Sequence, residues 1–162
     1  MADFLAMPPS EREVTHIDLI SEYLHRQAEA FVASIYTDQL QDICRRALHR
    51  VYPKGADICN ADDDLEYYFV VLSGLVYIEE PAVHHQDAAT AMRHRIVRRG
   101  EGFHHLPHCQ KARSYGFNAR AGDTPDCVDG VALLLIPTVE YASILRRFVE
   151  REVRETVTML SA

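Results

Sequence analysis

Residues 67–79, with the sequence YYFVVLSGLVYIE, contain the pattern that decides the fold. Aromatic and β-branched side chains dominate residues 67–72, and a second apolar run covers residues 75–79. Ser73-Gly74 lies between them, and such a pair is typical of a turn. Two β-prone runs joined by so short a turn predict a β-hairpin. The core and turn positions expected from this pattern are Phe69, Val71, Gly74 and Val76.

Further β-prone runs flank this pair on both sides. The segment from Pro81 to Arg95 lacks an apolar period and predicts an exposed loop whose role the sequence does not reveal. Lys54-Gly55 and Gly102-Phe103 are expected to form turns. The remaining predicted strands cover residues 49–52, 56–60, 95–99, 115–121 and 131–137.

Helices are predicted at both ends of the chain. Ser10 precedes Glu13 by three residues, the spacing of a capping box, and apolar residues then recur at helical spacing to Gln27. A second helix is expected to begin at Thr37 or Asp38. Its buried side is predicted to carry Leu40, Ile43, Cys44, Ala47 and Leu48. A C-terminal helical stripe is formed by Tyr141, Ile144, Leu145, Phe148, Val149 and Val153.

Helices that bracket a run of strands predict an α+β domain, with a β-roll or jelly-roll flanked by N-terminal and C-terminal helices. We expect a flexible N-terminus over residues 1–9, an N-terminal helix over residues 10–30 and the main domain over residues 31–162. With 162 residues and 48% hydrophobic composition, the chain is long enough to bury a core of its own.

Charge and cysteine usage narrow the possible partners and the compartment. The formal net charge of −7 argues against a nucleic-acid partner. Residues 1–10 have neither a basic flank nor a long apolar run, so the sequence predicts no membrane anchor and a cytoplasmic protein. The four cysteines form no CxxC pair and are expected to be free thiols: Cys44, Cys59, Cys109 and Cys127.

The order of these elements resembles the cyclic-nucleotide-binding family over residues 31–153. In that family, a strand and Lys-Gly turn precede an isoleucine strand, an acidic loop and an aromatic-V-x-x-x-G-x-V motif. Here these features are residues 52–55, Ile58, Asp62 to Asp64, and residues 69–76. The family motif Gly-Asp-x-Phe-Gly-Glu corresponds to residues 100–105, GEGFHH, and the family's Arg-Ala-Ala corresponds to residues 113–115, RSY.

The resemblance implies a nucleotide pocket, with departures at several positions. In that family, backbone amides of the motif bind the cyclic phosphate, and an arginine binds the phosphate as well. The glutamate of the motif accepts a hydrogen bond from a ribose hydroxyl. Arg113 retains that arginine, with a loop one residue shorter, whereas His104 and His105 replace Gly-Glu and Pro107 removes one amide donor. Loss of the charged acceptor costs about 1.5–3 kcal/mol. The implied ligand-binding residues are Gly102, Phe103, His104, His105, Leu106, Arg113, Ser114 and Tyr115.

We therefore expect a non-catalytic regulatory or scaffolding domain with weak or lost cAMP and cGMP binding, acting through a protein partner. The sequence contains no GxSxG, P-loop, GxGxxG or HExxH motif. An alternative is a working cyclic-nucleotide sensor, with Arg113 on the phosphate and the C-terminal helix as a lid. The sequence does not decide the preferred base or the oligomeric state.

A histidine-rich stretch leaves a metal-binding alternative open. Six of the nine histidines, with Cys109, lie in residues 84–109. A cupin-like metal protein would use His-x-His on one strand, but His104 and His105 are adjacent and would face opposite ways. A zinc site from His105, His108 and Cys109 stays open. Asp62 to Asp64 lack calcium-loop spacing, so no metal is assigned there.

Overall fold

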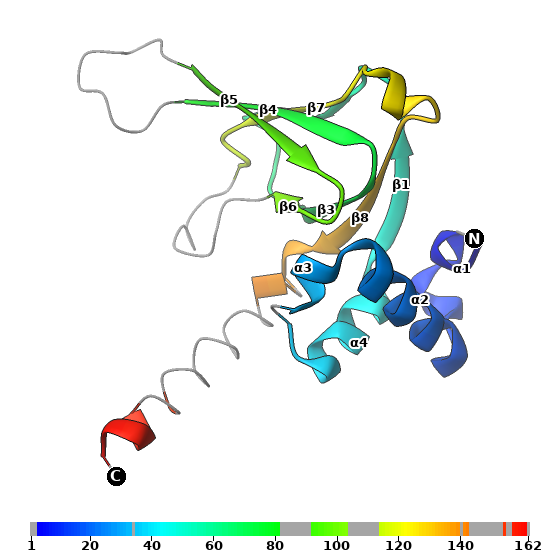
Figure 1. The fold of residues 1–162 in the computed structure, drawn as a ribbon, viewed down its shortest axis with the longest axis vertical. Helices are drawn as coiled ribbons and strands as arrows, with labels where there is room; N and C mark the ends of the chain where they lie inside the picture. Colours follow the sequence, from blue (N-terminus) through cyan, green and yellow to red (C-terminus); the bar gives the residue numbers. More distant parts are fainter. Residues whose placement is uncertain are drawn as a thin grey trace.

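A computed structural model describes residues 3–33, 35–81, 92–103, 114–139, 141–142, 154 and 157–161 (Figure 1). Its N-terminal part contains four α-helices and a short 3-10 helix. Their bounds are α1 (Asp3–Ala6), η1 (Pro9–Glu11), α2 (Val14–Gln27), α3 (Glu29–Ala33) and α4 (Thr37–Arg46). A further 3-10 helix, η3 (Pro125–Cys127), precedes the last strand.

The described strands form two antiparallel sheets. Sheet A has the order β1-β8-β3-β6, with β1 (Leu48–Tyr52), β8 (Val131–Pro137), β3 (Tyr67–Ser73) and β6 (Gly102–Phe103). Sheet B has the order β2-β7-β4-β5, with β2 (Asp57–Cys59), β7 (Asn118–Ala121), β4 (Leu75–Pro81) and β5 (Met92–Arg98). The α+β class and the β-roll expected from the sequence are confirmed.

Sheet A lies between the helices and sheet B (Figure 1). Along β3, Val70 and Leu72 pack into a cluster with the helices, whereas Phe69 and Val71 pack into a second cluster with sheet B. A strand buried on both faces needs apolar side chains at successive positions. This explains why residues 69–72 form a continuous apolar run and do not alternate with polar residues.

The two runs around Gly74 are strands, but the predicted hairpin pairing is wrong. β3 pairs with β8 and β6 in sheet A, whereas β4 pairs with β5 and β7 in sheet B. The turn therefore carries the chain from one sheet to the other. Gly74 has φ +79°, and a Cβ there would lie 3.0 Å from Val131 Cγ2, so both backbone and packing favour glycine.

The N-terminal helices differ from the prediction in their bounds. Pro8 precedes η1, which begins at Pro9, so Ser10 lies in a 3-10 turn, and α2 begins only at Val14 with Glu13 as its N-cap. Residues 10–30 are not one helix, because the chain leaves helical geometry at Ala28 before α3. Residues 3–6, expected to be flexible, form α1 and bury Leu5 in the helix-side cluster.

The start of α4 at Thr37 is confirmed, although Tyr36 is the N-cap. Leu48, predicted on this helix, instead begins β1. The three described cysteines, Cys44, Cys59 and Cys127, are buried free thiols, and Cys109 lies outside the described residues.

Three further segments correct or limit the predictions. Gly102-Phe103, predicted as a turn, forms β6 because it pairs with Phe69 and Val70 of β3. Within the predicted loop from Pro81 to Arg95, Pro81 belongs to β4 and residues 92–95 belong to β5, while residues 82–91 lie outside the described residues. At the C-terminus, residues 138–139, 141–142, 154 and 157–160 are helical, and the rest of the predicted helix lies outside the described residues. None of the described helices combines the length and apolar character that a membrane crossing requires.

Candidate functional site

The segment predicted to bind a ligand begins on β6. Phe103 is 1% exposed, and its ring centroid lies 4.9 Å from that of Phe69, nearly parallel to it. Gly102 packs directly under the ring of Tyr68, so that a Cβ at this position would overlap the Tyr68 hydroxyl. Of these two predicted site residues, Phe103 belongs to the core, and Gly102 permits a close approach of side chain to backbone.

The same segment ends at Ser114 and Tyr115, beside the acidic turn formed by Asp62 to Asp64. Ser114 forms an isolated β-bridge with Asp64, and the Tyr115 N–H donates to the Asp63 carbonyl at 3.2 Å. The Asp63 carboxylate in turn accepts the Asn60 N–H at 2.8 Å. The acidic turn therefore anchors the end of the segment.

Tyr115 is 3% exposed, so its side chain packs in the core while its backbone takes part in this anchor. Its hydroxyl accepts the Tyr67 N–H at 3.1 Å, and its ring centroid lies 5.7 Å from that of Phe69. Burial raises the pKa of Tyr115 to about 12. Phe103 and Tyr115 thus pack against one ring, so the structure brings both ends of the predicted segment together at Phe69. His104, His105, Leu106 and Arg113 lie outside the described residues.

Tyr68, which the sequence analysis did not single out, connects three parts of the molecule at this place. Its ring stacks on Tyr141 with centroids 4.1 Å apart and an interplanar angle of 11°, and on Phe31 of α3 at 6.1 Å. Its hydroxyl lies over Gly102. The start of the predicted site and Tyr141, the first residue of the C-terminal helical stripe, therefore contact the same side chain.

The hydroxyls of Tyr68 and Tyr141 are hydrogen-bonded to each other in this stack. Burial raises the pKa of Tyr68, while the bond with Tyr141 and the nearby charge of Arg95 lower it in part. Burial, followed by the interactions with Tyr68, raises the pKa of Tyr141. Both phenols are therefore neutral at physiological pH and form a rigid stacked pair.

Arg95 is a second residue that the sequence analysis missed, because it fell at the end of a predicted loop. By register it lies opposite Ile78, whose side chain is buried in the sheet-B cluster. Its Nε lies 3.7 Å from Glu80 Oε1, is itself buried and has no hydrogen-bond partner in the described part of the chain. A buried guanidinium N–H without an acceptor is suited to binding an anion.

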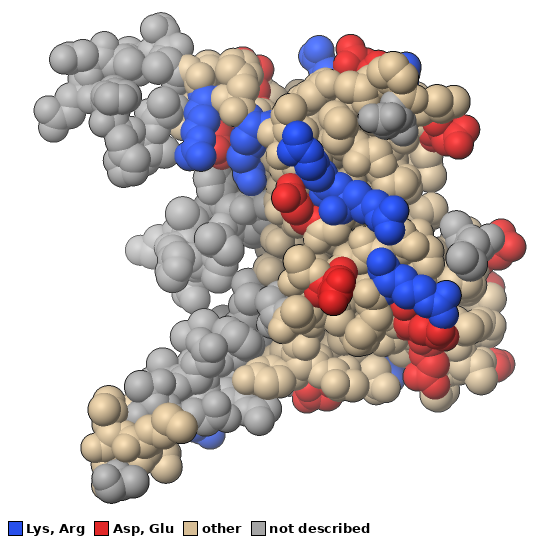
Figure 2. Space-filling view, viewed as in Figure 1, with Lys and Arg blue, Asp and Glu red and all other residues tan. Residues whose placement is uncertain are grey.

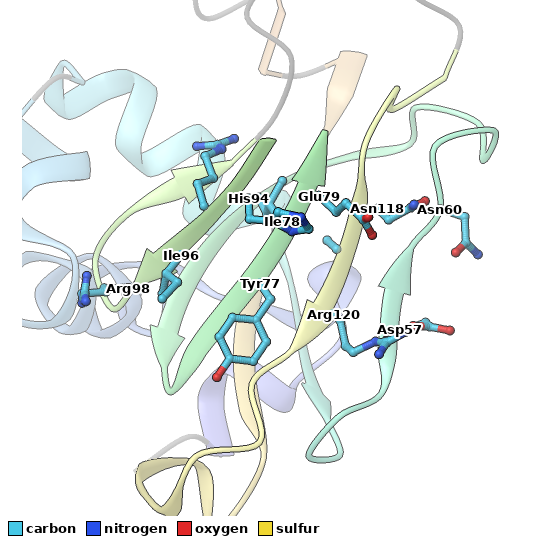
Figure 3. Close-up of a pocket in the computed structure, with 12 residues that line it drawn as sticks. Asp57, Asn60, Tyr77, Ile78, Glu79, His94, Ile96, Arg98, Asn118 and Arg120 are labelled. Carbon is cyan, nitrogen blue, oxygen red and sulfur yellow. Dashed lines mark hydrogen bonds and ion pairs between the residues drawn. The ribbon is translucent and has the colours of Figure 1, made fainter. Parts of the chain in front are cut away.

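A separate trough of about 730 Å³ lies on the other face of sheet B (Figure 3). Cross-strand register brings Tyr77, Ile96 and Arg120 side by side, and Arg120 Nε lies 3.2 Å from Asp57 Oδ1. The other residues that line the trough are Asp57, Asn60, Ile78, Glu79, His94, Arg95, Arg98, Asn118 and Ala119. Among the predicted ligand-binding residues that the structure describes, Gly102, Phe103, Ser114 and Tyr115, none lines this trough.

Metal-ligand geometry is not present in the described part of the chain, where no three His, Cys, Asp or Glu side chains form a group that could hold an ion. Of the six clustered histidines, His94 alone lies within that part. The zinc alternative depends on His105, His108 and Cys109, which lie outside it.

Comparison with known proteins identifies the fold. No protein-family model matches the sequence, and no curated protein matches it. Among solved structures, the sensor domain of the transcriptional regulator DNR from Pseudomonas aeruginosa matches with a TM-score of 0.62 and 12% identity, covering 90% of this chain and 89% of that one.

Two kinase regulatory proteins whose solved structures contain cAMP match as well. The regulatory domain of protein kinase A from Toxoplasma gondii has a TM-score of 0.62 and 8% identity, covering 86% of this chain and 50% of that one. A variant regulatory subunit of a cAMP-independent protein kinase A from Trypanosoma brucei has a TM-score of 0.61 and 10% identity, covering 86% and 48%. This chain therefore spans about half the length of these two proteins, and the likeness concerns the fold. The chain has the β-roll fold of cyclic-nucleotide-binding domains, the family that its sequence motifs resemble.

Proposed function

We propose that this chain is a non-catalytic regulatory or scaffolding domain of the cyclic-nucleotide-binding type, in which binding of cAMP and cGMP is weak or lost. Its output passes through the C-terminal helical stripe to a protein partner. Solved structures with the same fold include a sensor domain, a regulatory domain and a regulatory subunit, which supports a regulatory role.

The observation that carries this proposal is the packing around Tyr68. One end of the predicted site, Gly102, lies under the Tyr68 hydroxyl, and the Tyr68 ring stacks on Tyr141. A displacement of the backbone at Gly102 would therefore move a ring that stacks on Tyr141, the first residue of the C-terminal stripe. Because aromatic stacks in a close-packed core shift as units, such a displacement can change what the C-terminal residues present to a partner.

Weak or lost nucleotide binding is supported by residues of the family motif. His105 replaces the glutamate that, in the family motif, accepts a hydrogen bond from the ribose hydroxyl, and Pro107 lacks an amide hydrogen. Arg113 and Arg95 retain positive charge for a phosphate. The pocket thus keeps part of its attraction for an anion while losing contacts that discriminate a nucleotide.

A cytoplasmic location accompanies this proposal. Cys44, Cys59 and Cys127 are free thiols, and such thiols persist in a reducing compartment.

Isothermal titration of the full chain with cAMP and with cGMP tests the proposal. We expect no saturable binding below about 100 µM for either nucleotide. His105→Glu restores a charged acceptor, so we expect this variant to gain about tenfold in affinity, whereas Arg113→Ala should bind neither nucleotide.

Two outcomes would overturn it. Wild-type binding below about 1 µM that disappears in Arg113→Ala would make the chain a functional cyclic-nucleotide sensor. Stoichiometric metal in protein purified without a histidine tag would instead favour the cupin-like alternative.

A further inference from the structure

Strand β5 concentrates positive charge in an otherwise acidic protein. Residues 92–99 have the sequence MRHRIVRR, with four arginines and no acid, although the whole chain carries a formal net charge of −7. Glu80 is shared between two of these arginines, at 4.0 Å from Arg93 Nε and 3.7 Å from Arg95 Nε. Figure 2 shows several Lys and Arg side chains in a diagonal row on one face of the molecule.

This strand is also at the edge of sheet B. The order of the sheet is β2-β7-β4-β5, and within the described residues no strand pairs with the outer side of β5. An edge strand has a row of backbone N–H and C=O groups that point away from its neighbour.

The hydrogen bonds at the two ends of β5 show which residues present these groups. The Arg98 N–H donates to Glu101 Oε2 at 2.9 Å, and the Arg98 C=O accepts the Glu101 N–H at 3.0 Å, so both Arg98 groups point away from β4. At the other end, Met92 lies opposite Pro81, which has no N–H to offer. Antiparallel pairs alternate between bonded and non-bonded types, so His94 and Ile96 also direct their N–H and C=O groups to the outer edge.

The side chains beside this edge are suited to an acidic strand. By cross-strand register, Arg93 and Arg95 lie on the same face of the sheet as Ile78, whereas Arg98 lies on the opposite face with Ile96. An added strand with acidic residues would thus meet arginines on both of its faces, as cross-strand pairs of opposite charge. Ile96 is 46% exposed and Met92 is 41% exposed, so apolar contact is available as well.

We propose that β5 is a docking edge for an extended acidic segment of a partner protein, which adds as a strand alongside residues 92–98. The N–H and C=O groups of His94 and Ile96 form the new ladder, and the arginines select the charge of the segment. Because charged edge strands discourage neutral or like-charged strands, the same arginines prevent association of β5 with other edges.

Nucleic acid fits this surface less well. It would use the arginines but not the outward backbone groups or the exposed Ile96, and the net charge of −7 opposes a polyanion. The backbone groups therefore distinguish the two partners and provide the test.

The test uses fluorescence anisotropy with the full chain and a labelled peptide, Glu-Glu-Glu-Val-Glu-Glu-Glu. We expect saturable binding, and no binding of the counterpart in which lysine replaces each glutamate. Ile96→Pro removes an N–H that β4 does not use, so the sheet should persist while peptide affinity falls at least about tenfold. Ile96→Thr keeps the N–H and is the matched control, with affinity within about threefold of wild type.

Two further measurements keep the proposal falsifiable if Ile96→Pro disturbs the fold. A peptide N-methylated at alternate residues should lose affinity for the wild-type protein, because methylation removes the donors of the ladder. Equal affinity for the methylated and unmethylated peptides would overturn the proposal. So would binding of a thymidine oligonucleotide as tight as that of the acidic peptide, or equal peptide binding by the proline and threonine variants.

Discussion

Replacement of Arg12 by methionine tests the part of the fold that ties the N-terminal helices to α4. Arg12 is 9% exposed, and its guanidinium donates four hydrogen bonds to main-chain carbonyls. Nη1 reaches the Cys44 and Ala47 carbonyls at 2.8 and 2.7 Å, at the C-terminal end of α4, where carbonyls have no partner within the helix. Nη2 reaches the Leu5 carbonyl at 3.2 Å, which attaches α1.

The magnitude follows from these contacts. Hydrogen bonds to a charged donor contribute about 1.5–3 kcal/mol each, so the two short ones amount to about 3–6 kcal/mol. Burial lowers the pKa of Arg12, which reflects a cost of desolvating its charge that methionine does not incur. We therefore expect Arg12→Met to lower the free energy of unfolding by about 2–4 kcal/mol. For a chain of this length, that corresponds to a fall in Tm of about 6–12 °C.

Urea unfolding followed by circular dichroism measures the change, with Arg26→Met as the matched control. Arg26 has a 62% exposed side chain paired with Glu22 on the surface of α2, so its replacement should change the free energy by less than about 0.5 kcal/mol. If Arg12→Met and Arg26→Met have the same midpoint and slope, the carbonyl contacts of Arg12 do not stabilise the fold and the reasoning fails.

Three further predictions concern the site and the buried thiols. Gly102→Ala places a Cβ against the Tyr68 hydroxyl and should destabilise the domain by about 1–3 kcal/mol, which thermal unfolding measures; an unchanged Tm would contradict the packing. Wild type should lose stability between pH 10 and 12, and Tyr115→Phe should not show this loss. The folded-state pKa of Tyr115 exceeds its unfolded value, so its contribution is full below pH 10 and lost toward pH 12; chemical unfolding across this range measures it, and parallel curves for both proteins would refute it. Burial raises the pKa of Cys44 and Cys59 to about 12, so both should resist a disulfide reagent at pH 8 until urea is added, and rapid labelling of the folded protein would contradict this.

The predicted site shows which functional residues the spacing of sequence motifs could identify and which it could not. The resemblance placed Phe103 and Tyr115 near the two ends of one segment, and the structure brings both rings together at Phe69. It did not identify Tyr68 or Arg95, because neither belongs to a motif and their importance comes from neighbours distant in sequence. Tyr68 contacts Phe31 and Tyr141, which lie 37 and 73 residues away along the chain.

Local sequence patterns were sufficient to predict several helices and strands. The helix from Thr37, the strands around Gly74 and the strand over residues 131–137 follow from side-chain period, turn residues and β-propensity, which depend on near neighbours in sequence. The order of these elements was also enough to indicate the β-roll.

The sequence by itself determined the types of the main elements, the glycine turn at residue 74 and the resemblance in fold. The tertiary structure alone decided that β3 and β4 belong to different sheets, that Gly102-Phe103 is a strand, and that Arg12 is buried among carbonyls. It also decided on which side β5 pairs with no described strand. The physical reason is that strand pairing and burial depend on contacts between segments that are distant in sequence. The spacing of apolar residues within one segment does not specify which distant segment it contacts.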